Sequence, residues 1–231
     1  MKGALSLDDI KLDVLVVGGG ISGMQSALDL ADQGYQVALV EKEPSIGGKM
    51  IALSKVFPTL DCCSCITTPK MSAVAHHENI QLFTFCEVQS IIKNDHGYNV
   101  QIFKKPRYVN EDTCTGCRQC EYACPVNLPN PFDLDMGATR AVRVPFSTAV
   151  PQTAMLDIDN CILCGKCEKI CPVNAIDFTQ EPEFFEIRAT SLILATGFET
   201  TPRNAKKEYR ADQIHNVIDC LLYTSPSPRD R

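Results

Sequence analysis

The clearest pattern of apolar and polar positions lies in the first fifty residues. The run DVLVV at 13–17 is continuous and apolar, as in a strand buried on both faces of a parallel sheet. GGGISG follows directly, a helical pattern then continues to about residue 33, and Gly34 ends it. The segment YQVALVEKE adds a second strand that ends at Glu41. Strand, helix and strand in this order predict a β-α-β unit.

Further along the chain the pattern changes twice. Residues 44–68 show no periodicity, residues 69–77 are expected to be helical with Pro69 in the first turn, and two alternating runs flank an NDHG turn. Residues 106–182 are rich in proline and cysteine and contain no long periodic element. Strand character returns in EFFEIRA and SLILATGF. The simplest topology is a nucleotide-binding fold that starts at residue 13, is interrupted by an inserted module, and is completed by residues 191–197.

Composition and charge narrow the class of protein. The chain has 231 residues, of which 45% are hydrophobic, and this suits a globular protein with one sizeable core or two small ones. The net charge is −6 and no segment concentrates Lys and Arg, so we expect no nucleic-acid partner. The apolar runs are shorter than the roughly 20 residues of a membrane helix, and the first residues lack the apolar core of a signal peptide. We therefore expect a cytoplasmic protein without a membrane span.

The cysteines carry the strongest chemical signal. Thirteen are many for a cytoplasmic protein, and an odd, clustered set indicates metal binding because disulfides are rare in that compartment. The spacing C-x2-C-x2-C-x3-C-P occurs twice, at 114–125 and 161–172. In two-cluster ferredoxins the proline-followed cysteine of each repeat binds the other repeat's cluster. This crossover assigns Cys114, Cys117, Cys120 and Cys171 to one [4Fe-4S] cluster, and Cys161, Cys164, Cys167 and Cys124 to the other.

Glycines and prolines inside the two repeats fit the same interpretation. Gly116 and Gly165 allow each loop to bend tightly, and Pro125 and Pro172 fix the turn after the last ligand. Structural zinc is the alternative, because zinc also binds paired C-x2-C motifs. A zinc site has no use for the third cysteine of each repeat or for the Cys-Pro, so the spacing favours iron and sulfur.

A second motif indicates a dinucleotide. Gly18, Gly20 and Gly23 form G-x-G-x-x-G between the first strand and the helix, where the backbone can approach a pyrophosphate at the helix N-terminus. Glu41 ends the second strand, where a carboxylate accepts a hydrogen bond from a ribose hydroxyl and disfavours a 2′-phosphate. The alternative is a glycine-rich structural turn. Spacing alone does not separate FAD from NAD.

Resemblance to known families separates them. EKEPSIGGKM after the second strand and ILATGF at 193–198 are similar to FAD-binding proteins with two dinucleotide-binding domains. The resemblance implies that FAD is the dinucleotide and that further residues bind it, namely Lys42, Gly47, Gly48, Thr196 and Gly197. The fold class expected is α/β, a Rossmann-like FAD-binding domain with an inserted ferredoxin-like α+β module that holds two clusters.

The full motif set resembles one family of iron–sulfur flavoproteins. FPTLDCCSCITTPKM, KKPRYVNEDTCTGC and PFSTAVPQ are together similar to the A-type subunit of heterodisulfide reductase from anaerobes, over residues 12 to 220. The resemblance implies an oxidoreductase subunit that passes electrons between FAD, clusters and partner subunits in a hetero-oligomer, with a hydrogenase, a formate dehydrogenase or ferredoxin as electron donor. Family members often have an N-terminal cysteine-bearing domain and a second nucleotide-binding half that this sequence lacks, so we expect a fragment.

The same resemblance gives a role to a third group of cysteines. Cys62, Cys63 and Cys65 lie in a segment that the family places near the flavin with an extra [4Fe-4S] cluster. Cys62 and Cys65 keep the x2 spacing, and a further ligand is needed from Cys86, Cys220 or outside the sequence; buried apolar cysteines are the alternative. Lys70 is expected to lie over the reactive edge of the flavin, where a cation stabilises the reduced form, although a surface lysine is the simpler interpretation.

The domain boundaries follow from these assignments. We expect residues 1–105 and 183–220 to form the FAD-binding domain and residues 106–182 to form the ferredoxin-like insertion, and we leave 221–231 unassigned. Three other functions are compatible with the motifs. They are the flavoprotein subunit of a quinone-interacting membrane-bound oxidoreductase, an electron carrier whose nucleotide fold is empty, and a zinc-bound regulatory protein.

Overall fold

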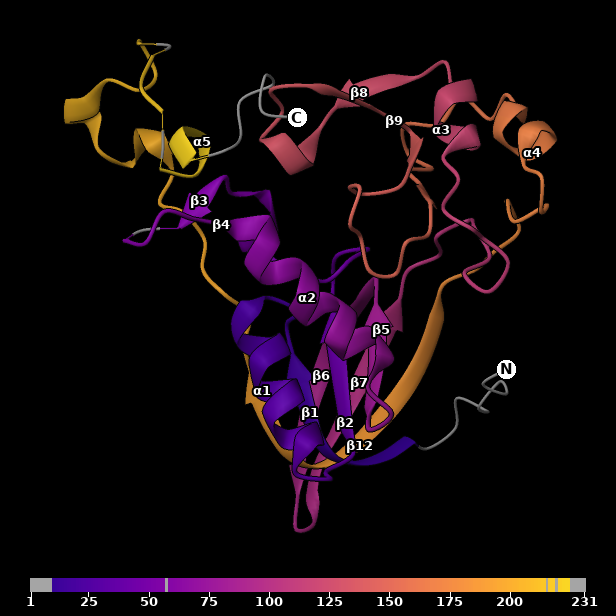
Figure 1. The fold of residues 1–231 in the computed structure, drawn as a ribbon, viewed down its shortest axis with the longest axis vertical. Helices are drawn as coiled ribbons and strands as arrows, with labels where there is room; N and C mark the ends of the chain where they lie inside the picture. Colours follow the sequence, from indigo (N-terminus) through magenta and orange to yellow (C-terminus); the bar gives the residue numbers. More distant parts are fainter. Residues whose placement is uncertain (1–9, 57, 215, 219, 225–231) are drawn as a thin grey trace.

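A computed structural model describes residues 10–56, 58–214, 216–218 and 220–224. A six-stranded sheet forms the lower part in Figure 1, and a cysteine-rich module lies above it. The strands follow the order β5-β2-β1-β12-β7-β6. Their bounds are β1 Ile10–Val17, β2 Val37–Glu41, β5 Ile80–Thr84, β6 Cys86–Asn94, β7 Gly97–Lys104 and β12 Glu183–Leu194.

The parallel half of the sheet confirms the predicted β-α-β unit and the α/β class. β1 pairs in parallel with β2 and with β12, and β2 pairs in parallel with β5, so the carboxyl ends of four strands meet at one edge. All five residues of β2 are buried, as the uninterrupted apolar pattern predicts for a central parallel strand. EFFEIRA and the SLIL of SLILATGF belong to one continuous strand, β12, and are not the two separate strands that the sequence indicates.

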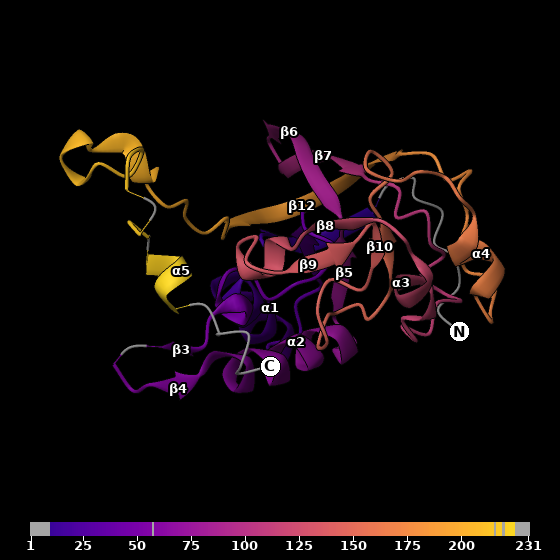
Figure 2. The same cartoon turned by 90° about the horizontal axis from the view of Figure 1, so that it is seen from above.

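Two helices cover one face of the sheet. Helix α1 (Ile21–Asp32) and helix α2 (Cys63–His76) lie side by side in Figures 1 and 2, on the same side of the strands. Met24 and Ala27 of α1 and Met71 and Val74 of α2 are fully buried against the strands. Burial of a side chain the size of Met or Val typically stabilises a fold by about 1.5–3 kcal/mol.

The opposite face of the parallel strands is covered by the β6–β7 hairpin of the same sheet. The β6–β7 hairpin turns back so that β6 contacts β2, although the two strands are far apart in the strand order. A second apolar cluster fills the space between them, with Leu15, Val40, Val100, Ile102 and Ile187 at its centre. The long strand β12 makes this possible, because it pairs with β1 on one side and with β7 on the other.

The cysteine-rich module starts and ends at one point of the sheet. Lys104 ends β7, and it is the register partner of Glu183, which begins β12. Because these two residues are neighbours in the antiparallel ladder, the chain between them forms a separate unit without disturbing the sheet. The module has its own apolar core, which includes Val109, Val142, Leu156 and Ile176.

Short elements make up the module and its surroundings. In the module they are α3 Gln119–Ala123, β8 Asn127–Pro129, η2 Pro131–Asp133, β9 Ala138–Arg140, β10 Val142–Arg143, β11 Met155–Leu156 and α4 Lys166–Ile170. Before α2 lie η1 Met50–Ala52 and the hairpin β3 Lys55–Val56 with β4 Asp61–Cys62. After β12 come η3 Arg203–Ala205, η4 Lys207–Tyr209 and α5 Cys220–Thr224. Among the described residues, no helix is long and apolar enough to cross a membrane.

Helix α2 differs from the helix expected at residues 69–77. It begins at Cys63 and contains Pro69 in its interior instead of in its first turn. The hydroxyl of Thr67 donates to the carbonyl oxygen of Cys63 at 2.8 Å within the first turns. Cys62 caps the helix through its sulfur, so the cysteine segment is the ordered start of a helix and not the irregular loop that its lack of periodicity indicates.

Candidate functional site

The predicted dinucleotide loop lies at the carboxyl edge of the parallel strands. Gly18 has a φ of +109°, and a Cβ there would collide with the carbonyl oxygen of Ala195. A Cβ on Gly23 would collide with the carbonyl oxygen of Gly18. Both positions therefore require glycine for packing within the protein itself. Gly20 is different, because nothing lies within 4 Å of the position of a Cβ there. The space beside Gly20, at the N-terminus of α1, is where a pyrophosphate would bind.

Glu41 anchors the glycine loop through a hydrogen bond to its backbone. Its carboxylate accepts a hydrogen bond from the Gly19 N–H at 2.6 Å and another from the Glu43 N–H at 2.9 Å. The side chain is only 7% exposed, and this burial raises the pKa of Glu41, partly offset by the two backbone hydrogen bonds. Each carboxylate oxygen can accept more than one hydrogen bond, so Glu41 also fits the predicted contact with a ribose hydroxyl.

Two further segments close over the glycine loop. Gly47 donates its N–H to the carbonyl oxygen of Gly19 at 2.8 Å, and the Cβ of a residue at Gly48 would lie 2.9 Å from the Gly20 Cα. The Ala195 N–H donates to the carbonyl oxygen of Val17 at 2.8 Å, which brings the segment after β12 beside the glycines. Of the expected FAD residues, Gly47 and Gly48 thus lie against the glycine loop, and the Thr196 backbone nitrogen lies close to Gly18. Lys42 and Gly197 are exposed, and the structure places neither against the loop.

Lys49 joins these two segments and was not identified from the sequence. Its ammonium lies 4.5 Å from the centre of the Phe198 ring and donates to the Phe198 carbonyl oxygen. The contact connects the segment after β2 with the segment after β12. Nothing in the sequence pattern indicates this pair, because the two residues are far apart along the chain.

Substituting Glu41 tests the proposed ribose contact. In Glu41→Gln the amide nitrogen has no lone pair for the Gly19 or Glu43 N–H, so one buried donor loses its acceptor. We expect the free energy of unfolding to fall by about 1–3 kcal/mol. FAD affinity should fall by ~10-fold or more, because loss of a hydrogen bond to a charged group costs about 1.5–3 kcal/mol. Urea unfolding and flavin fluorescence titration measure the two effects.

Glu43→Gln is the matched control for that substitution. The Glu43 side chain is exposed, and its backbone N–H continues to bond Glu41 in the variant. The free energy of unfolding and the FAD affinity should therefore both remain at wild-type values. Equal effects of the two substitutions would remove Glu41 from the site.

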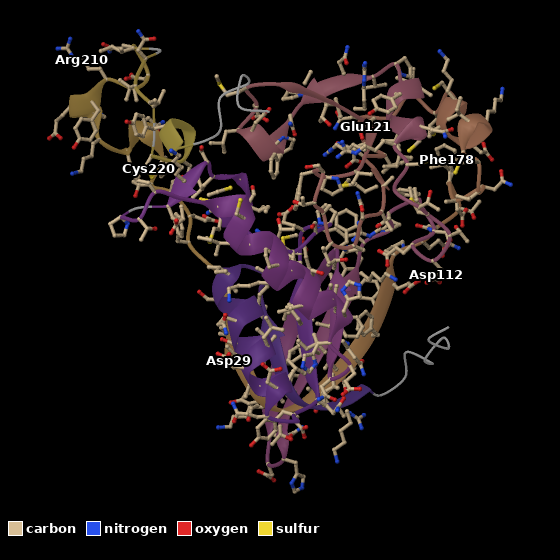
Figure 3. The ribbon with its side chains drawn as sticks, viewed as in Figure 1. Asp29, Asp112, Glu121, Phe178, Arg210 and Cys220 are labelled. Atoms are coloured by element: carbon tan, nitrogen blue, oxygen red, sulfur yellow. The ribbon has the colours of Figure 1, made fainter. Side chains whose placement is uncertain are left out.

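The first cysteine set surrounds one cavity of the module. Cys114, Cys117 and Cys120 line this cavity together with Cys171, which comes from the second repeat. Figure 3 shows sulfur atoms grouped near α3, where Glu121 is labelled, and near α4. A cavity lined by four thiols from two distant segments fits a cubane cluster, which needs one thiolate for each iron.

The second set repeats the same arrangement. Cys120 and Cys167 are buried at equivalent positions in helices α3 and α4, which pack against each other. Cys124 lies with Cys167 in the apolar core of the module, and Cys161 packs against that core from one side. Cys164 is exposed, like Cys117 at the equivalent position of the first repeat. The two repeats therefore have nearly the same burial pattern.

Backbone conformation explains how the two loops bend. Each repeat has two residues in the left-handed region, at the position before its second cysteine and at the position after it. The first repeat places Gly116 and Arg118 there, and the second places Leu163 and Gly165. Each loop thus has a glycine at only one of its two left-handed positions. The sequence identifies the glycines correctly but contains no signal for the two other residues.

The two glycines predict unequal effects of the same substitution. An alanine at either position costs about 1–2 kcal/mol, because both adopt a left-handed conformation. At Gly116 the Cβ also collides with the carbonyl oxygen of Gln152, whereas at Gly165 the nearest atom is 3.9 Å away. We expect Gly116→Ala to lose most of the first cluster and Gly165→Ala to retain both. Iron and sulfide content with thermal unfolding measures this difference, and equal losses would contradict it.

Burial controls the chemistry of the thiols. Desolvation raises the pKa of Cys120 to about 12 and also raises the pKa of Cys167. Burial thus favours the neutral thiols of both side chains, which would release their protons on binding iron. Backbone N–H groups also point at sulfur, from Leu163 to Cys161 at 3.3 Å and from Ala175 to Cys171 at 3.2 Å. Such hydrogen bonds help to set the potential of an iron–sulfur cluster.

The described residues contain no group of three His, Cys, Asp or Glu side chains placed to hold one metal ion. A cubane cluster asks for a different geometry, because its thiolates bind separate irons around a shared volume. The four cysteines that line one cavity supply the four thiolates that such a cluster needs.

The third group of cysteines is at the start of α2. The Cys62 sulfur accepts a hydrogen bond from the Cys65 N–H at 3.4 Å, and both side chains are exposed. A hydrogen bond from the Cys65 thiol lowers the pKa of Cys62. Cys63 is fully buried and faces the core. Cys62 and Cys65 thus share one exposed surface, and Cys63 does not.

Of the two candidates for a further ligand, only one is exposed. Cys86 is 1% exposed within the core, and its thiol donates to the Thr84 carbonyl oxygen at 3.3 Å. Burial raises the pKa of Cys86 to about 12. Cys220 is exposed on α5, which lies beside the β3–β4 hairpin in both Figure 1 and Figure 2. The structure thus argues against Cys86 and leaves Cys220, exposed on α5, as the candidate among the described residues.

Lys70 lies on α2 and faces α1. Its ammonium donates to the side-chain oxygen of Gln25, one turn after the N-terminus of α1. Lys70 is partly buried by this contact and is not a free surface lysine. Its role toward the flavin stays a prediction.

Comparison with known proteins confirms the two cofactor classes. Residues 13–57 match the family described as FAD dependent oxidoreductase. Residues 113–176 match the family described as 4Fe-4S dicluster domain. The first match covers the glycine loop and Glu41, and the second covers both cysteine repeats.

Similar proteins are known from methanogenic archaea. An A-type iron-sulfur subunit of CoB–CoM heterodisulfide reductase from Methanopyrus kandleri is 50% identical over 94% of this chain and 34% of its own length. The A-type subunit of the H2:CoB-CoM heterodisulfide,ferredoxin reductase of Methanothermobacter thermautotrophicus is 47% identical over 94% of this chain and 32% of its own. The corresponding subunit of the H2/formate:CoB-CoM heterodisulfide,ferredoxin reductase of Methanococcus maripaludis is 48% identical over 92% of this chain and 32% of its own length. The chain spans about a third of the length of these relatives.

Proposed function

Because the chain resembles the A-type subunits of heterodisulfide reductases over nearly its whole length, we propose that it is the part of such a subunit that passes electrons between FAD and [4Fe-4S] clusters. The observation that carries the proposal is the cavity in which cysteines of both repeats meet, in a module hydrogen-bonded to the segment after β2 that covers the dinucleotide loop. Neither site alone supports electron relay, whereas the two together in one folded unit do.

Close contact between the two sites supports the relay. The Ile46 N–H, next to Gly47, donates to the Val150 carbonyl oxygen of the module at 3.1 Å. The Val150 N–H donates in return to the Ser45 hydroxyl at 2.8 Å. Two residues further on, Gln152 contacts Gly116 in the first cluster loop. A short run of backbone thus joins the flavin segment to the first cluster loop.

The chain's own residues perform binding, orientation and exclusion of water. Bound FAD accepts an electron pair and the clusters carry single electrons. The α1 N-terminus and the open space beside Gly20 take the pyrophosphate, while Glu41 fixes the glycine loop and accepts from the ribose. The eight cysteines of the two repeats hold the two clusters in the predicted crossover. Burial of Cys120, Cys124 and Cys167 keeps water from one side of each.

A third cluster at the start of α2 is part of the proposal. Cys62 and Cys65 provide two exposed sulfurs, Cys220 is the further ligand from the described residues, and the fourth comes from outside them. Cys63 is buried and has an apolar packing role. Lys70 contacts Gln25 of α1, and its proposed role is that of a cation over the reactive edge of the flavin.

Partners follow from the names of the relatives. The methanogen proteins are named as subunits of reductases linked to H2, formate or ferredoxin. We propose that the present chain likewise functions in a cytoplasmic hetero-oligomer, with other reductase subunits and a hydrogenase, a formate dehydrogenase or ferredoxin as electron donor. A quinone-linked membrane complex would differ by a membrane partner that copurifies.

Analysis of anaerobically purified protein tests the proposal. We expect one FAD and about eight iron and eight sulfide per chain, or about twelve of each if the third cluster is complete. Cys220→Ser should then reduce the iron content from about twelve to about eight and leave the flavin in place. Iron and sulfide without flavin would favour an electron carrier with an empty nucleotide fold. Zinc without sulfide would exclude the proposal.

A further inference from the structure

Arg107 is a buried cation that none of the proposed binding sites uses. It lies at the start of the module, and its side chain is 2% exposed. Its guanidinium Nη2 donates to the Pro44 carbonyl oxygen and to the Thr84 hydroxyl, both at 2.6 Å. Its Nε forms an ion pair with Glu111. One side chain thus connects the flavin segment after β2, the end of β5 and the loop before the first cysteine repeat.

The environment keeps this guanidinium charged although it is buried. Burial lowers the pKa of Arg107, and the nearby charge of Glu111 opposes this. An arginine remains protonated because its ordinary pKa is above 12. The Phe85 ring lies 5.5 Å from the guanidinium carbon and offers its negative face to the cation. The contacts are those of a fixed cation and not of a surface arginine.

The positive charge of Arg107 is more deeply buried than the negative charge of its partner Glu111. Glu111, its partner, has a side chain that is 36% exposed, so water screens the carboxylate more than the guanidinium. Nη1 is buried and has no hydrogen-bond partner among the described residues. A buried charge with one half-screened partner exerts a field on groups nearby.

The contact with Glu111 connects Arg107 to the loop of the first cluster. Glu111 lies in the loop that leads to Cys114, and the Cys114 N–H donates to the carbonyl oxygen of Asn110 in that loop at 3.0 Å. Asp112 of the same loop is labelled in Figure 3. Val109, two residues after Arg107, lines the cavity of the first cluster together with Cys114. The second repeat has no corresponding arginine, because Ala154 stands at the equivalent distance before it along the chain.

We propose that Arg107 is a positioning residue that fixes the first cluster against the flavin segment, and that its positive charge raises the reduction potential of that cluster selectively. This inference rests on the proposed function. When one electron passes from reduced flavin to the first cluster, the cluster becomes more negative by one unit and the flavin loses one electron. A nearby cation stabilises the more negative state, so the transfer toward this cluster is favoured.

Two substitutions test the role of the charge, because one removes the positive charge of Arg107 and the other removes the negative charge of Glu111. In Arg107→Met the cation is lost and Glu111 remains, so the first cluster should become harder to reduce, by about tenfold in its reduction equilibrium, which is ~59 mV for one electron. In Glu111→Gln the cation loses its partner, so the same cluster should become easier to reduce. If Arg107 and Glu111 only held the loop in place, both substitutions would shift the reduction potential of the first cluster in the same direction. Redox titration followed by electron paramagnetic resonance measures the two potentials.

Three controls make the result decisive. The second cluster in the same molecules should keep its potential, and Arg107→Lys should keep the first potential within a few fold because the charge is retained. Arg188→Met removes an arginine paired with Glu186 on the sheet and should change neither potential. The inference is overturned if both variants shift alike, or if both clusters shift together. Wild-type protein without clusters or flavin would instead overturn the proposed function, and the inference with it.

Discussion

Replacing Cys171 by serine is expected to remove the first cluster and to leave the second in place. Cys171 lies in the second repeat, yet it lines the cavity formed by Cys114, Cys117 and Cys120. A hydroxyl binds iron less well than a thiolate, and loss of one ligand opens the cluster to solvent. Iron and sulfide content should fall from about eight to about four per chain.

Double substitutions show which cysteines share a cluster. Cys114→Ser with Cys171→Ser removes two ligands of the same cluster, so about four iron should remain, as in either single variant. Cys124→Ser with Cys171→Ser removes one ligand from each cluster, so almost no iron should remain. If each repeat instead holds its own cluster with its own fourth cysteine, the first pair would lose all iron. Cys86→Ala is the control, because that buried thiol is not a ligand and its loss should leave all iron in place.

Replacing Gly20 by valine is expected to abolish FAD binding without unfolding the chain. Gly20 has an extended backbone with φ −74°, and nothing lies within 4 Å of a Cβ there, so the protein itself accepts a larger side chain. The valine would fill the space assigned to the pyrophosphate. We expect FAD affinity to fall by about 100-fold, close to the upper cost of overpacking a site, ~3 kcal/mol. Titration of the apoprotein with FAD measures the affinity, and thermal unfolding measures the stability of the folded chain.

Gln33→Val is the control for this substitution. Gln33 lies exposed at the other end of α1, where it caps the helix. The same side chain there should leave FAD affinity unchanged. If Gly20→Val bound FAD as tightly as wild type, the pyrophosphate would have to lie elsewhere.

The sequence predicts the elements whose signal is local. The β-α-β unit is readable because strands buried on both faces are uninterrupted and apolar, and because the glycines sit where the backbone must turn. The cysteine repeats are readable because each contains its three x2-spaced ligands within one loop. The pairing of Cys171 with the first loop could be assigned only from the rule for two-cluster proteins, and the structure brings these residues to one cavity.

What the sequence did not predict depends on contacts between distant segments. Helix α2 starts at Cys63 because a cysteine sulfur caps it, although cysteine is an uncommon cap and Pro69 indicates a later start. Arg107 sits in KKPR, where it resembles a solvated basic residue, and only folding shows it against Pro44 and Thr84. Arg118 and Leu163 adopt left-handed conformations that their residue types do not indicate.

Anaerobic reductive titration of the purified chain tests the central claim most directly. If one FAD and two cubane clusters share this chain, the flavin takes two electrons and each cluster takes one, so full reduction should consume about four electrons per chain. Bleaching of the flavin absorbance and the electron paramagnetic resonance signals of two reduced clusters should develop within one titration. Uptake of only about two electrons, with either the flavin or the cluster signals missing, would contradict the account.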